Sequence, residues 1–137
     1  MIQKPQKVQN AVARLIYKLP KCSSVNQEIR KLHWLRVEQR CVYKILLIVY
    51  KRFNCTSPAF LCSLLEISDP EIKKLECTYY HTKLGRRAFR YTAPRLWNKL
   101  PLNMRIEESI DTFKRNLKTL LFDHTGDILK GLNVYMT

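Results

Sequence analysis

The chain has 137 residues, a length typical of one domain that can bury a sizeable core. Hydrophobic residues make up 46% of it and only three positions are glycine, which argues against a disordered chain. The 25 Lys and Arg against 11 Asp and Glu give a formal net charge of +14. Such an excess favours an anionic partner, with nucleic acid as the first expectation and an anionic membrane surface as the second.

Neither export nor membrane insertion is expected. The opening residues MIQKPQKVQN lack the apolar run of a secretory signal. The longest apolar run, residues 45–50, is far shorter than the roughly 20 residues that span a bilayer. We therefore expect an intracellular chain, in the cytoplasm or nucleus, whose five cysteines are reduced.

The first half, residues 4–65, is predicted to be helical. Residues 6–19 repeat apolar positions at three- and four-residue spacing, which predicts an amphipathic helix that ends before Pro20. Its expected inward stripe is Val8, Val12, Leu15, Ile16 and Leu19. Ser24 and Gln27 resemble a capping box that opens a short helix reaching Leu32.

A central helix is predicted next, because residues 37–53 are apolar on most faces. Its expected inward set is Val42, Ile45, Leu46, Val49 and Phe53. Ser57 and Pro58 supply a cap and a first-turn proline for a helix over residues 58–65.

Residues 66–84 are predicted to be a linker. Asp69 and Pro70 mark a turn, residues 71–76 could form one helical turn or two, and residues 77–81 have weak strand character.

A second, basic helical half is predicted over residues 85–123, followed by a flexible tail at 124–137. Helical spacing returns over residues 88–99, where Pro94 requires a kink or a late start, and Ser109 caps a last helix. The apolar stripe of that helix is Ile110, Phe113, Leu117, Leu120 and Leu121. We expect a mostly α fold of about six helices, in one small domain or in two loosely joined halves.

The residues that carry the functional argument lie between positions 85 and 101. No acid occurs between Glu76 and Glu107, and aromatic residues alternate with cations. The cations are Arg86, Arg87, Arg90, Arg95 and Lys99. Such a mixture suits a polyanion, because the cations can hold phosphates while the rings stack on bases or fill the core. The alternative is a solvated helix face with Trp97 in the core.

Metal binding and catalysis are not expected. Cys55, Cys62, Cys77 and His81 could supply four ligands, but six residues separate the first pair and structural zinc usually has two to four. None of the five cysteines has a nucleophile-type context, and three glycines could hardly build a phosphate-binding loop. We therefore expect no enzyme, no cofactor and no small-molecule substrate.

Five blocks resemble the C-terminal region of non-LTR (LINE-type, jockey-like) retrotransposon reverse transcriptases. Residues 7–15, KVQNAVARL, resemble the family's KVQNRAARL, and residues 32–38, LHWLRVE, resemble LHWLPVE. Residues 44–51 resemble the start of KILLLTYKALHG, residues 93–101, APRLWNKLP, resemble APRLWNSLP, and residues 109–122 are similar to SLDSFKSRLKTYLF. Their order and spacing agree over about residues 4–123.

Departures from the family pattern indicate a drifted copy. Arg36 replaces the usual proline, Cys55 replaces the usual glycine, and residues 66–84 match poorly. A polymerase needs paired aspartates for two metal ions, whereas Asp69, Asp111, Asp123 and Asp127 are isolated. The resemblance thus implies only the non-catalytic end of a polyprotein, surviving as a truncated, inactive remnant.

Resemblance and charge together predict a segment that holds the RNA or DNA backbone without reading its sequence. The expected phosphate-binding residues are Arg86, Arg87, Arg90, Arg95 and Lys99, helped by Lys7, Arg14 and Lys18. The alternative is a structural docking module that packs on the polymerase core without contacting nucleic acid. Peripheral membrane binding is not expected, because the apolar helix faces are needed for the core.

Overall fold

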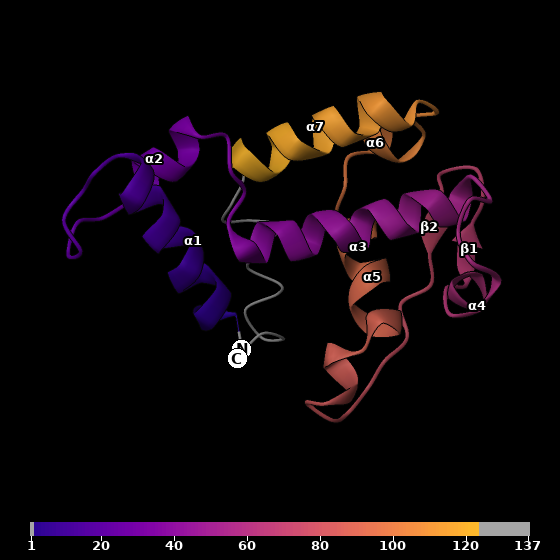
Figure 1. Ribbon diagram of the computed structural model, residues 1–137. Coiled ribbons are helices and arrows are strands. Elements are labelled where there is room, and N and C mark those ends of the chain that lie inside the picture. Colours follow the sequence, from indigo (N-terminus) through magenta and orange to yellow (C-terminus); the bar gives the residue numbers. More distant parts are fainter. Residues whose placement is uncertain (1, 124–137) are drawn as a thin grey trace.

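The structure, a computed structural model, describes residues 2–123; the tail expected at 124–137 lies outside the described residues. In chain order the elements are α1 (Gln3–Ile16), α2 (Asn26–Lys31), α3 (Val37–Phe53), α4 (Ala59–Ser63), β1 (Ile67–Asp69), β2 (Lys74–Leu75), the 3-10 helix η1 (Gly85–Arg87), α5 (Phe89–Asn98), α6 (Leu102–Arg105) and α7 (Ile110–Asp123). Figure 1 shows the long α3 across the middle of the molecule, with α7 along one side and α5 on the other. The predicted mostly α fold is confirmed.

The central helix α3 has the predicted bounds, Val37–Phe53. Its buried face consists of Gln39, Val42, Leu46, Val49 and Tyr50. Ile45 and Phe53, expected in the inward set, lie half-buried at the margin of the core. Tyr50 takes an inward place because its ring stacks on Phe113, with centroids 4.2 Å apart, and its hydroxyl donates to the Glu108 carbonyl over 2.7 Å.

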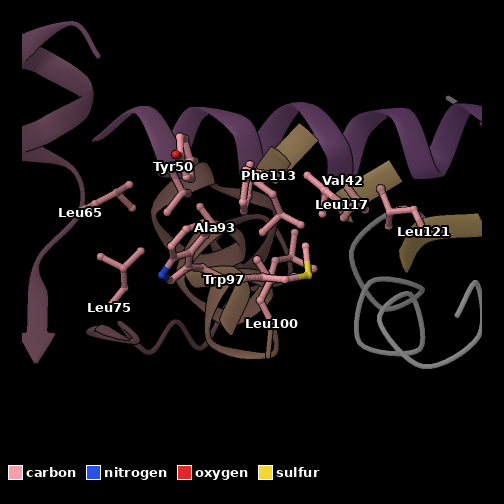
Figure 2. Packing of buried hydrophobic residues seen from close by; sticks show 14 of the residues in the cluster. Val42, Tyr50, Leu65, Leu75, Ala93, Trp97, Leu100, Phe113, Leu117 and Leu121 are labelled. Atoms are coloured by element: carbon pink, nitrogen blue, oxygen red, sulfur yellow. The ribbon is translucent and has the colours of Figure 1, made fainter. Parts of the chain in front are cut away.

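The main core brings together both predicted halves of the chain. Figure 2 shows Trp97 from α5 beneath α3, with Phe113, Leu117 and Leu121 arriving from α7. Trp97 is fully buried, stacks on Phe53 at 5.3 Å and donates its indole N–H to the Lys73 carbonyl over 2.6 Å. Burial of each such side chain contributes about 1.5–3 kcal/mol. The expected stripe of α7 is confirmed, with Ile110 and Leu120 at its half-buried edges.

Residues 66–84 contain a small antiparallel strand pair that was not predicted from the sequence. Ile67 pairs with Leu75 and Asp69 with Lys74, so the helical turn considered over residues 71–76 is wrong. The turn at Asp69 is confirmed, because its Oδ1 accepts from the Glu71 amide over 3.0 Å. Leu75 is buried in the main core, and its backbone N–H and C=O both bond to the Asn98 side-chain amide. This segment is therefore fastened to α5.

A second, smaller cluster joins α1 to α2. Its buried members are Ala13, Val25 and Ile29. The helix α1 ends at Ile16, and Lys18 then adopts a left-handed φ of 52°. The capping box expected at Ser24 is wrong, because α2 begins at Asn26 after Val25.

The predicted inward stripe of α1 is largely exposed. Val8 is 64% exposed, Val12 41%, Leu15 79% and Ile16 50%, and Ala13 is the residue that α1 buries. The expectation that every apolar helix face is needed for the core is therefore wrong for α1. No helix within residues 2–123 is long and apolar enough to cross a membrane.

Candidate nucleic-acid interface

The eight cations predicted to bind phosphate lie on two parts of the molecule. One set lies on η1 and α5 or directly after α5: Arg86, Arg87, Arg90, Arg95 and Lys99. The other set lies on α1 and in the turn after it: Lys7, Arg14 and Lys18. In Figure 1, α1 lies at the start of α3 and α5 packs against α3 further along.

The Arg95 guanidinium fastens an irregular segment to α5. Its Nη1 donates to the carbonyl of Thr78 over 3.0 Å and to that of Tyr91 over 3.1 Å. Its central carbon lies 3.6 Å from the centre of the Tyr91 ring, within the range of a cation–π contact. Arg95 is half-buried, and its Nη1 donates both of these bonds to backbone carbonyls.

Arg86 and Arg90 also have partners within the chain. The Nε of Arg86 donates to the Tyr80 carbonyl over 3.2 Å. Arg90 forms an ion pair with Glu66, which precedes β1. The basic stretch contains no acidic residue, but the fold places Glu66, which is 24 residues before Arg90 in the chain, beside it. The pair is exposed on both sides and adds at most about 1 kcal/mol of stability.

Arg14, in the set on α1, also donates to a backbone carbonyl. Its Nε and Nη2 donate to the Ser23 carbonyl over 3.2 and 3.1 Å, across the turn between α1 and α2. Arg52 and Arg105 do the same for the carbonyls of Cys62 and Ile72. A guanidinium has five N–H donors, so it can bond to backbone carbonyls that accept no hydrogen bond within a helix or a sheet. Several arginines of this chain therefore stabilise irregular backbone.

The remaining predicted cations lie at the surface. Arg87, Lys99, Lys7 and Lys18 are exposed. Within residues 2–123 the structure pairs two cations with carboxylates, Arg90 with Glu66 and Lys114 with Asp111. The surface of the described chain thus carries a large excess of positive charge.

A groove between α1 and the start of α3 was not foreseen from the sequence. It has a volume of about 640 Å³, and Val8, Val12 and Trp34 contribute to its apolar lining. The cations Arg40 and Lys44 of α3 also line it, together with Lys118 of α7. The four-residue spacing of Arg40 and Lys44 could have indicated a basic helix face, but not the groove beside it.

Metal-ligating residues do not converge in the described part of the chain. Within residues 2–123, no three His, Cys, Asp or Glu side chains lie close enough to hold a metal ion. Trp97 is fully buried, whereas Trp34 is half-buried and lines the groove. Comparison of the chain with known protein families, with curated proteins and with solved structures finds no significant match.

Proposed function

We propose that the chain is a non-catalytic nucleic-acid-binding segment of a non-LTR retrotransposon reverse transcriptase, surviving as a truncated and inactive remnant. The resemblance of blocks such as residues 93–101 supports the family. The observation that carries the binding function is the excess of exposed cations over carboxylate partners in residues 2–123. RNA and DNA backbones are the polyanions that such a surface suits.

The proposed mechanism divides the basic residues into two roles. Lys99 follows the last turn of α5 and Arg87 precedes its first, so both flank the helix at the surface. These two residues hold phosphates, with Lys7 and Lys18 as a second contact region. Arg86 and Arg95 are positioning residues, because their bonds to the carbonyls of Tyr80 and Thr78 shape the surface next to α5. No base edge is read, so binding is independent of sequence.

Fluorescence anisotropy across a salt series tests this proposal, with a labelled RNA hairpin and a labelled DNA duplex. The double variant Arg87→Gln/Lys99→Gln removes two proposed phosphate ligands. We expect the slope of log affinity against log salt to fall by roughly 0.7–0.9 for each cation that no longer binds a phosphate. Affinity at low salt should fall for every sequence alike.

Lys31→Gln/Lys74→Gln is the matched control, because it removes the same charge from exposed positions on α2 and β2. Equal reductions in affinity from both double variants would mean that net charge alone attracts the nucleic acid, and an unchanged slope in the α5 variant would refute the assignment. Circular dichroism of each variant checks that the helices remain.

A second candidate function is the structural docking module that packs on a polymerase core. The exposed stripe of α1 favours it, since Val8, Leu15 and Ile16 are each at least half-exposed. Such apolar faces mark interaction surfaces. We expect strong uptake of an environment-sensitive dye, and we expect Val8→Asp/Leu15→Asp to abolish it. Weak dye uptake by a folded monomer would count against docking.

A further inference from the structure

The groove between α1 and α3 combines an apolar lining with a basic border. Val8 and Val12 lie one turn apart on α1, and Trp34, Leu35 and Val37 line the groove from the chain that enters α3. Two hydrogen bonds join α1 to the segment that enters α3. The Gln9 side chain donates to the Leu35 carbonyl over 2.9 Å, and the Val37 amide donates to Gln6 Oε1 over 3.0 Å.

The charges that line the groove have one sign. Arg40, Lys44 and Lys118 contribute to it, and no Asp or Glu is among the described residues that form its wall. Arg40, Lys44 and Lys118 are exposed, and the two ion pairs described for residues 2–123 involve none of them. An occupant must therefore supply both apolar side chains and negative charge.

We propose that this groove binds an acidic amphipathic helix of a partner protein. Val8 and Val12, with Leu15 and Ile16 beyond them, form a ladder at helical spacing, the pattern on which the apolar stripe of a second helix packs. The 14 residues of α1 correspond to about 21 Å of helix at 1.5 Å per residue. Glutamates beside the partner's stripe would lie against Arg40, Lys44 and Lys118. This inference gives the docking function a definite surface and rests on that function.

Two other occupants fit less well. A second copy would bring its own α1, which carries Lys4, Lys7 and Arg14 and no acid, against a basic border. Like charges placed together oppose association. A nucleic-acid strand would satisfy the cations but would leave the aliphatic Val8 and Val12 without apolar partners. An acidic amphipathic segment matches both features.

Fluorescence anisotropy of the full chain with a designed labelled peptide provides the test. The probe is a helix of about 15 residues, long enough to be partly helical in water, with leucines at three- and four-residue spacing and glutamates elsewhere. A second peptide with serine in place of each leucine has the same charge and measures attraction by charge alone. We expect the leucine peptide to bind at least tenfold more tightly.

Substitutions locate the site. Val8→Asp/Val12→Asp should weaken the leucine peptide by at least tenfold, and Phe60→Asp should leave its affinity within twofold. Phe60 is the matched control because it is 66% exposed and lies on α4, at the other end of α3 (Figure 1). Arg40→Glu/Lys44→Glu should weaken the acidic peptide and strengthen a version with lysine in place of glutamate.

Several results would overturn the inference. Equal binding of the serine peptide would reduce the site to charge, and displacement of the peptide by RNA with the same sensitivity to Val12→Asp would make the groove a nucleic-acid site. A dimer in light scattering that Val12→Asp converts to a monomer would assign the groove to a second copy. Tighter peptide binding by Leu129→Asp/Leu132→Asp would assign it to the chain's own C-terminal segment. Dye uptake at α1 without peptide binding would leave the docking function standing and refute only its acidic partner.

Discussion

The helices α1 and α7 are a natural pair for comparison, because each has 14 residues and an apolar stripe at helical spacing. The helix α7 buries Phe113, Leu117 and Leu121 against α3 and α5, whereas α1 buries Ala13. Leu117 is fully buried and Leu15 is 79% exposed. A stripe therefore predicts that a helix forms and which face will be covered, but not whether this chain supplies the cover.

The means of attachment differ in the same way. The helix α7 is held by the main core, supported by the bond from Gln39 Nε2 to the Leu121 carbonyl over 2.6 Å. The helix α1 depends on a small cluster and on hydrogen bonds that Gln9 and Arg14 donate and Gln6 accepts. Polar bonds contribute less than a packed core does, so α1 is expected to open before α7.

The largest expected difference comes from one substitution made on both helices. Leu117→Ala leaves a cavity in the main core and should lower the free energy of unfolding by about 2–5 kcal/mol. Leu15→Ala removes an exposed side chain and should change it by less than about 0.5 kcal/mol. Urea unfolding followed by circular dichroism measures both. Equal reductions in the free energy of unfolding would show that α1 is covered in solution and would break the comparison.

The same two helices show which features of the fold could be predicted from the sequence. The bounds of α3 and the stripe of α7 were predictable, because long periodic segments carry their own signal. The exposure of Leu15 was not predictable, because the sequence of α1 does not indicate which elements will pack against it. The ion pair of Arg90 with Glu66 was also missed, because it depends on a fold that brings together residues 24 positions apart.

Arginine roles were the hardest part of the candidate site to foresee. Arg86 and Arg95 bond to the carbonyls of Tyr80 and Thr78. Because every residue has a backbone carbonyl, the sequence does not indicate which carbonyl an arginine will bind. Net charge alone does not distinguish arginines that bond to backbone carbonyls from exposed lysines. The strand pair around residues 67–75 was missed for another reason, because elements of two and three residues have no periodic signal.

An intermediate effect is expected from arginine substitutions on the two helices. Arg14→Ala removes both bonds to the Ser23 carbonyl and should weaken the junction of α1 and α2 by about 1 kcal/mol, since the side chain is only half-buried. Arg115→Ala on α7 removes an equal charge from an exposed side chain and is the control. Hydrogen exchange should quicken in α1 and α2 for the first variant and in neither for the second. Unchanged exchange in the Arg14 variant would show that the small cluster alone holds the junction.

The smallest effect should come from Gln9→Ala, which removes the bridge from α1 to the Leu35 carbonyl. A bond of this kind is worth about 0.5–1.5 kcal/mol, and its removal should appear as faster exchange confined to α1 rather than as a lower global stability. Asn116→Ala, at an exposed position of α7, is the matched control. If Gln9→Ala instead lowered the midpoint of global unfolding as far as Leu117→Ala does, α1 would be part of the main cooperative unit. The polar bridge, and not the apolar stripe, would then be what joins α1 to the rest of the fold.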